Sequence, residues 1–271
     1  KEHETRQLVD AYHFFRRLLN ALRMLRGSAE DLFLPSTGAD EYMHLARRAG
    51  YTWRDGFSPV QILHTEFETR TASIRRFIEE HLGRESIPGK HTGNAADMVL
   101  SDSLPTEAEY EILKDGGFQN PTRSRENIRI MSGRGKQRIL FAHLAVLAWD
   151  ILKATPDPDM ALNNWERFVR AVPDAENHYQ ELLSQPKRLE ILLHIFAGSQ
   201  FLSDTLVKYP AFFEWVTTPQ LISTIRSKKA IEEDLAALST KCTDSKIWLN
   251  ELRTFRKREI LRVGTRDICL K

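Results

Sequence analysis

Residues 136–153 read KQRILFAHLAVLAWDILK, and this stretch decides the fold. Its apolar residues recur at three- and four-residue steps, which is the spacing of one face of an α-helix. They are Ile139, Leu140, Leu144, Leu147, Ile151 and Leu152. A few residues later, Asp157-Pro158 supplies a cap and a first-turn proline for a second helix. The stretch therefore predicts a continuous helix-turn-helix arrangement.

The same pattern extends towards the C-terminus. Apolar stripes predict helices over Ala175–Ser184, Pro186–Ala197 and Ser199–Lys208, and a long basic helix over Ser245–Leu270. Aromatic residues such as Trp165 fall on these stripes, which is typical of core positions. No segment shows clean alternation of apolar and polar residues, so we expect an all-α protein built from helical bundles.

Three further helices are predicted before this region. The first carries Leu8 to Leu25 and ends at Gly27, the second spans Asp40–Ala49, and the third begins at Ser58-Pro59 and ends at Gly83. Between Arg84 and Leu104 the periodicity lapses into Pro, Gly, Ser and Asp, which is linker composition. We expect this stretch to be mobile and the first site of proteolysis. Beyond it, Thr106 and Glu109 form a predicted capping box.

These boundaries suggest a short N-terminal three-helix body and a larger multi-helix C-terminal body. The predicted units are a helical tail at 1–84, a linker at 85–104, a short helical connector at 105–133, a central domain at 134–243 and a final helix at 244–271. The first helix of so small a body would expose Phe15, Leu19 and Leu22. We therefore expect the two bodies to dock, or the chain to self-associate through that helix.

Composition narrows the classes of function. The 271 residues include 39 Lys+Arg and 37 Asp+Glu, so the net charge of +2 does not call for nucleic acid or an anionic membrane. The two cysteines, Cys242 and Cys269, do not indicate a disulfide scaffold. Without an apolar run of membrane-spanning length or a signal pattern at the start, we expect a cytoplasmic protein. Its first residue is not Met and its last lies in a helical pattern, which suggests a piece of a longer polypeptide.

Catalytic and metal-binding motifs are weak. Asp157-Pro158-Asp159 is the one Asp-x-Asp, and we interpret it as a helix cap rather than a carboxylate pair for magnesium. The nine histidines are scattered, so His143, His178 and His194 are expected to bind no metal. We assign no catalytic, cofactor-binding or metal residue to this chain.

Two patterns leave functional alternatives open. Arg is followed by His after five or six residues at Arg76/His81, Arg138/His143 and Arg188/His194, the spacing of some helical ribonucleases. In the last helix, Arg258, Arg262 and Arg266 recur every four residues. This row is a candidate partner contact for phosphates or an acidic protein, and the alternative is a solvated helix face.

Several blocks carry a resemblance to the bifunctional glutamine synthetase adenylyltransferase/adenylyl-removing enzyme family. AYHFFRRL at 11–18, LARRAGY at 45–51, GGFQNP at 116–121, PDPDMAL at 156–162 and GSQFLSDTL at 198–206 are similar to blocks of the family's helical regions. The stretch from Leu252 to Asp267 resembles the helix that leads into a nucleotidyltransferase core. The stretch Ile87–Ser103 matches nothing in the family.

The resemblance implies a position between two nucleotidyltransferase units of an enzyme that attaches AMP to glutamine synthetase and removes it. It implies ATP and magnesium as cofactors of the whole enzyme, with none in this chain. It implies the flanking nucleotidyltransferase domains as partners, with the PII signal protein and glutamine synthetase as further candidates. The resemblance therefore implies that this chain has a regulatory role and no catalytic activity of its own. The alternatives are a free-standing helical adaptor and, third, a helical ribonuclease-like module.

Overall fold

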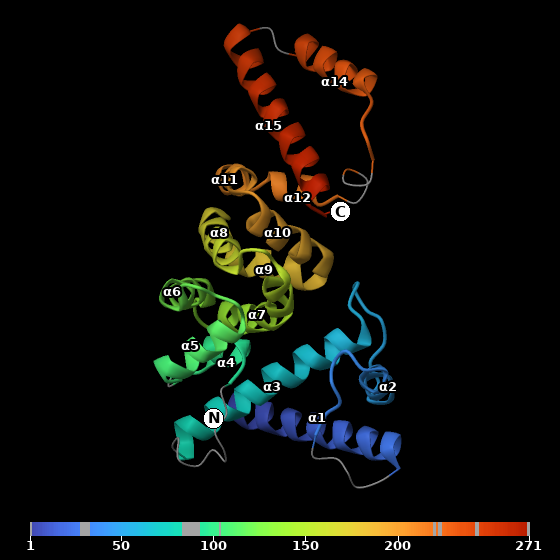
Figure 1. The fold of residues 1–271 in the computed structure, drawn as a ribbon, viewed down its shortest axis with the longest axis vertical. Coiled ribbons are helices and arrows are strands. Elements are labelled where there is room, and N and C mark those ends of the chain that lie inside the picture. Colours follow the sequence, from blue (N-terminus) through green and yellow to red (C-terminus); the bar gives the residue numbers. More distant parts are fainter. Residues whose placement is uncertain are drawn as a thin grey trace.

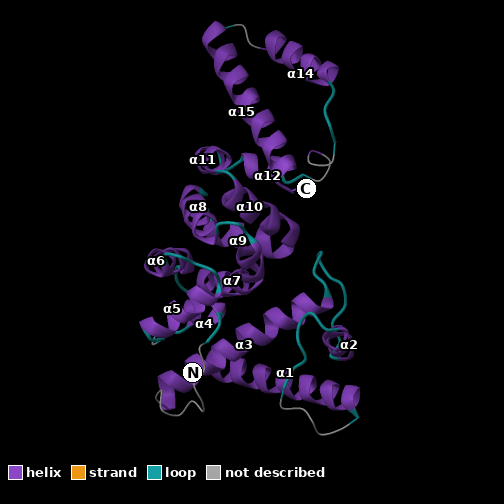
Figure 2. Cartoon of the chain, viewed as in Figure 1, coloured by secondary structure: helices purple, strands orange, loops and turns teal. Residues whose placement is uncertain are grey.

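The computed structural model describes residues 2–27, 33–82, 93–102, 104–218, 221, 224–241 and 244–269. Within these ranges the fold is all-α, without a strand, as predicted (Figure 2). The helices are α1 Glu2–Arg26, α2 Asp40–Arg48, α3 Pro59–Leu82, α4 Ala95–Leu100, α5 Thr106–Asp115, α6 Pro121–Ser132, α7 Lys136–Ala154, α8 Pro158–Ala171, α9 Ala175–Ser184, α10 Pro186–Gly198, α11 Gln200–Lys208, α12 Phe212–Val216, α14 Lys228–Lys241 and α15 Ser245–Cys269.

The helices form an elongated molecule with three tiers (Figure 1). α1, α2 and α3 make the N-terminal body at one end, α4 to α12 make the central body, and α14 and α15 form a hairpin at the other end. α15 runs from the far tip back to α12, so the C-terminal end of the described chain returns to the central body. This return places α15 against α10, α11 and α12.

The N-terminal body has a small core of its own. Phe14, Leu18 and Leu22 of α1 are buried against Leu45 of α2 and Leu63 of α3. Phe15 and Leu19 are only partly covered. The predicted stops of the first two helices are confirmed, with positive φ angles at both glycines that follow them. The predicted stop of α3 at Gly83 lies outside the described residues.

The central body is built around α7 and α8. Trp165 and Phe168 of α8 are almost completely buried, as predicted. Phe141 of α7 is also almost completely buried, although it lies outside the predicted apolar stripe. Tyr179 of α9 is fully buried and its hydroxyl donates a hydrogen bond of 2.8 Å to the Met131 carbonyl, so its polar end is satisfied. Helix α7 therefore lies in one continuous core, but its most buried face differs from the predicted stripe. Of that stripe only Leu144 and Leu152 are fully buried, while Leu140, Leu147 and Ile151 are partly buried and Ile139 is 43% exposed.

The linker prediction for 85–104 is wrong over residues 95–100. These residues form α4, and all six are buried between α3 and α7. Asn94 caps α4, and the Arg138 guanidinium of α7 donates to the Val99 carbonyl at 2.6 Å. Sequence composition failed here because AADMVL is too short to display a helical period. Residues 84–92 lie outside the described part of the chain.

α4 also joins the two bodies. Asp97 is paired with Arg75 of α3, and Asn94 donates to the carboxylate of Glu68. The expected docking of the two bodies is therefore found, but it runs through α3, which packs on α4 and α7, while α1 packs on α2 and α3.

One other prediction needs correction, and two helices were not predicted. The predicted capping box at Thr106 and Glu109 is not formed, because Pro105 occupies the cap position without a side-chain bond. Glu109 is instead buried between Arg125 and Arg129 of α6. Helices α12 and α14 were also missed. No described helix has the length and apolarity needed to cross a membrane.

Candidate functional site

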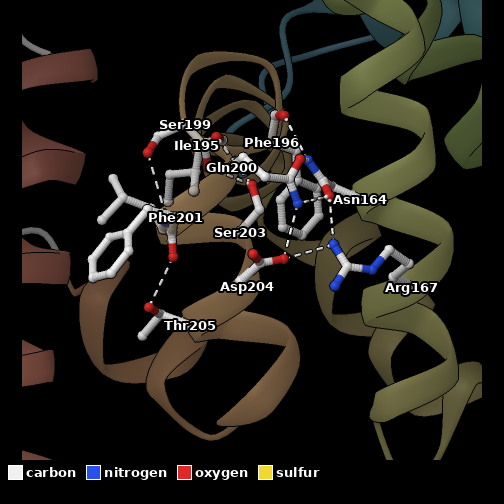
Figure 3. Close-up of polar contacts among 11 residues, drawn as sticks. Asn164, Arg167, Ile195, Phe196, Ser199, Gln200, Phe201, Ser203, Asp204 and Thr205 are labelled. Atoms are coloured by element: carbon white, nitrogen blue, oxygen red, sulfur yellow. Dashed lines mark hydrogen bonds and ion pairs between the residues drawn. The ribbon is translucent and has the colours of Figure 1, made fainter.

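Four polar side chains meet where α8 packs against α11 (Figure 3). Asn164 and Arg167 are three residues apart on α8, and Gln200 and Asp204 are four residues apart on α11, so each pair shares one helix face. We call these four residues the α8–α11 hub.

Asn164 is the buried centre of the hub, with 1% of its surface exposed. Its amide nitrogen donates to the Phe196 carbonyl at 3.1 Å and to Gln200 Oε1 at 3.2 Å. Its oxygen accepts from Gln200 Nε2 at 3.1 Å and from Arg167 Nη1 at 3.0 Å. Because Phe196 lies in the last turn of α10, where carbonyls lack partners within the helix, Asn164 also satisfies the end of α10.

Asp204 closes the hub on its exposed side. Its carboxylate accepts from Arg167 Nη1 at 2.7 Å and from Gln200 Nε2 at 2.9 Å. The hydrogen bond from Arg167 holds the pKa of Asp204 below its usual value. Both side chains are about half exposed, so water screens the pair and its contribution to stability is small.

Two serines fix the turn that carries the hub. Ser199 caps α11, accepting from the Leu202 amide at 3.3 Å. Ser203 is fully buried and donates to the Ser199 carbonyl at 2.8 Å. The block at 198–206, which carries the resemblance, is thus the turn between α10 and α11 together with the α11 side of the hub.

The Asp-x-Asp sequence is used for structure. Asp157 caps α8 by accepting from the Met160 amide at 2.8 Å, as predicted. Asp159 accepts from the backbone amides of Gln119 and Asn120 at 2.6 and 3.1 Å, and from the Ser124 hydroxyl at 3.0 Å. With their oxygens engaged in this way, the two carboxylates do not fit the role of a magnesium-binding pair.

Helix α15 is bound to the central body through its basic residues. Lys257 donates to the Tyr209 hydroxyl at 2.8 Å and lies 4.7 Å from the centre of its ring. This hydrogen bond lowers the pKa of Tyr209. The Arg258 guanidinium lies 4.3 Å from the ring centre of Trp215 in α12.

The predicted row of Arg258, Arg262 and Arg266 is therefore not an exposed face. Arg262 is 4% exposed and donates to Glu259 at 3.0 Å and to the Thr224 carbonyl at 3.3 Å. Arg258 stacks on Trp215, and Arg266 is half-buried in the last turn. A four-residue spacing places residues on one face but does not reveal which neighbour covers that face.

Arg138 and His143 of α7 both contact backbone carbonyls. Arg138 binds the carbonyls of Val99 and Leu100 and the carboxylate of Asp102, so its guanidinium holds α4 in place. His143 Nδ1 lies 2.8 Å from the Ile139 carbonyl of its own helix. Within the described ranges, no three His, Cys, Asp or Glu side chains are placed to hold a metal ion.

Sequence reasoning missed Asn164 and Arg167 entirely. The available signal was a polar residue inside the apolar stripe of α8, between Leu162 and Trp165. A buried amide needs partners, and α11 supplies them only in the folded chain. The arrangement can hold α8, α10 and α11 in one relative position. The polar groups of the hub form hydrogen bonds with one another.

Comparisons with known proteins match both ends of the chain. Residues 189–270 match the family model described as glutamate-ammonia ligase adenylyltransferase, and residues 1–82 match that of the GlnD PII-uridylyltransferase. The first range includes α11 and α15, and the second covers the N-terminal body. No solved structure matches the chain significantly.

Curated relatives match nearly the whole chain. They are bifunctional glutamine synthetase adenylyltransferase/adenylyl-removing enzymes, including those of Rhodopseudomonas palustris (strain HaA2), 23% identical over 269 residues, and Mycobacterium marinum (strain ATCC BAA-535 / M), 22% identical over 267 residues. Each match covers 96% of this chain. The chain spans about a quarter (26%) of the length of each relative. These matches confirm the resemblance carried by the sequence blocks, and the chain is therefore related to the bifunctional glutamine synthetase adenylyltransferase/adenylyl-removing enzymes.

Proposed function

We propose that this chain is the non-catalytic, regulatory connector of an enzyme that attaches AMP to glutamine synthetase and removes it in response to nitrogen status. The names of the relatives supply the activity and the substrate. The observation that carries the connector role is the attachment of α15 to the central body by Lys257 and Arg258. Arg262 adds a hydrogen bond to the Thr224 carbonyl, between α12 and α14. A helix fastened in this way follows any movement of the body.

The hub links the helices that lie between α15 and the α5–α6 turn. α15 packs on α10 and α11, the hub ties α11 to α8, and Asp159 at the start of α8 holds the turn between α5 and α6. Helix packing of this kind has discrete arrangements, so a ligand that favours one of them at one end changes the other end. We propose that such a shift relays nitrogen status between two nucleotidyltransferase units.

The proposal assigns catalysis to the partner domains. ATP and magnesium would bind to those domains, since the one Asp-x-Asp of this chain is engaged in capping α8 and holding the α5–α6 turn. The proposed partners are the flanking nucleotidyltransferase domains, glutamine synthetase and the PII signal protein, in the cytoplasm. Self-association through the exposed face of α1 remains part of the proposal.

The catalytic part is tested by incubating the chain with ATP, magnesium and glutamine synthetase. We expect no adenylylation and no deadenylylation above a blank without protein. Turnover above that blank would contradict the connector role.

The sensing part is tested by calorimetry of the whole chain with the PII protein and with glutamine. We expect binding weaker than that of the intact enzyme, because neighbouring domains share the interface. Absence of heat at near-millimolar concentration would exclude direct sensing and leave a mechanical connector.

A further inference from the structure

The cavity between the two bodies has a volume of about 580 Å³ and is lined by α1, α3 and α7, with Phe57 before α3 and Leu183 of α9. This is larger than the 510 Å³ cavity beside α14 and lies within the usual range for small-molecule sites. The floor is α3, which packs on α7, while α1 closes one side from the N-terminal body. A molecule held there would touch both bodies.

One wall carries hydroxyl groups. Thr65, Thr69 and Ser73 lie four residues apart on α3 and all three line the cavity. Thr69 donates to the Thr65 carbonyl at 2.7 Å and Ser73 to the Thr69 carbonyl at 2.9 Å, so their oxygens keep acceptor capacity. Thr65 is 9% exposed and, among the described residues, its hydroxyl has no hydrogen-bond partner. A buried hydroxyl without a partner is costly, and a ligand would relieve that cost.

The remaining wall is largely apolar. Ile62 and Phe77 of α3, Leu8 of α1, and Leu140 and Leu147 of α7 line it. His143 lies among them, with Nδ1 committed to the Ile139 carbonyl, so in the neutral ring Nε2 is left as an acceptor. A ligand that fits this wall has an apolar body.

Charges around the cavity are balanced. Two acidic residues, Asp10 and Glu66, and two basic residues, Arg70 and Arg76, line the cavity, and Glu66 is paired with Arg70 at 2.7 Å. An ionised ligand would lose hydration without gaining an excess of opposite charge. The lining therefore favours a neutral head group.

We propose that this cavity binds an uncharged amphipathic small molecule, whose apolar chain lies against α7 and whose hydroxyl or amide head bonds to Thr65. This site is independent of the proposed connector role. It concerns binding by the chain itself and needs no adenylyl transfer.

The test uses 1-octanol as the probe, titrated into the whole chain and followed by calorimetry and by NMR shifts. We expect saturable binding to one site, with shifts confined to α1, α3, α7, Phe57 and Leu183, and a higher melting temperature in its presence. Octanoate should bind more weakly. Absence of saturable binding at about millimolar octanol, or equal affinity for octanoate, would overturn the proposal.

The variants locate the site. Thr65→Val keeps the shape and removes the hydroxyl, so we expect roughly 2- to 10-fold weaker octanol binding. Thr71→Val is the matched control on the same helix, because Thr71 lies outside the lining and bonds to the Phe67 carbonyl. Ser73→Leu fills the cavity and should abolish binding while circular dichroism stays native. Unchanged affinity in Thr65→Val, or an equal loss in Thr71→Val, would refute the assignment.

Discussion

Gly264 of α15 lies directly over Leu202 of α11, so close that a Cβ atom at Gly264 would come 2.6 Å from Leu202 Cδ1. Leu202 is 4% exposed and cannot easily move away. A similar approach occurs at Gly198, where a Cβ would lie 3.1 Å from Ile268 Cδ1. α15 therefore crosses α10 and α11 at a separation that the two glycines make possible.

Gly264→Ala should destabilise the chain, although the same change in an exposed helix stabilises it by about 1 kcal/mol. Overpacking against Leu202 costs about 1–3 kcal/mol, so we expect a net loss of roughly 1 kcal/mol in urea unfolding. Val263→Ala is the control, because Val263 is 55% exposed. In a Leu202→Ala background the effect of Gly264→Ala should become stabilising. A stabilised single variant would contradict the close crossing.

Asn164→Ala should cost far more stability than Asp204→Asn. The first change leaves the Phe196 carbonyl and the Gln200 amide without their buried partner, which costs about 1–3 kcal/mol. The second weakens a screened surface pair, for which about 0–1 kcal/mol is usual. Denaturant unfolding of both variants checks this order, and equal losses would show that Asn164 is not the centre of the hub.

Arg262→Ala should loosen α15 more than Arg256→Ala. Arg262 is buried and bonds to Glu259 and the Thr224 carbonyl, whereas Arg256 is exposed on the same helix. Removing the Arg262 guanidinium leaves Glu259 paired only with Arg226 and leaves the Thr224 carbonyl without this hydrogen-bond donor. Hydrogen exchange of α15 amides should accelerate in the first variant and not in the second. Equal protection in both would contradict the burial of Arg262.

His178 should make the chain acid-sensitive. Burial among Phe168, Tyr179 and Phe213 lowers its pKa from 6.5 to about 4, because desolvation disfavours the charged ring. Between these values the unfolded chain binds the extra proton, so the stabilisation present above pH 6.5 is lost as the pH falls towards 4. Because of this group, the free energy of unfolding should be roughly 2 kcal/mol lower at about pH 5 than at about pH 7.5. His178→Phe should remove that part of the difference, and an unchanged pH profile would contradict the assignment.

Local patterns predicted much of the fold. The helix over 136–153, the Asp157 cap and the positions of Gly27 and Gly50 all depend on neighbours within a few residues, and the structure confirms them. The similarity blocks likewise indicate the relatives from the sequence alone. These features survive because helix periodicity, capping and glycine geometry act at short range.

Tertiary structure decided the rest. Asn164, Arg262 and α4 acquire their roles from residues more than twenty positions away, such as Phe196, Thr224 and Arg138. The spacing of Arg258, Arg262 and Arg266 correctly placed them on one helix but could not show that other helices cover that face. The sequence by itself determined the helical segments other than α4, α12 and α14, and the family to which the chain is similar. Only packing decided which polar groups are buried and which partners they find, because desolvation and hydrogen bonding depend on distant parts of the chain brought together.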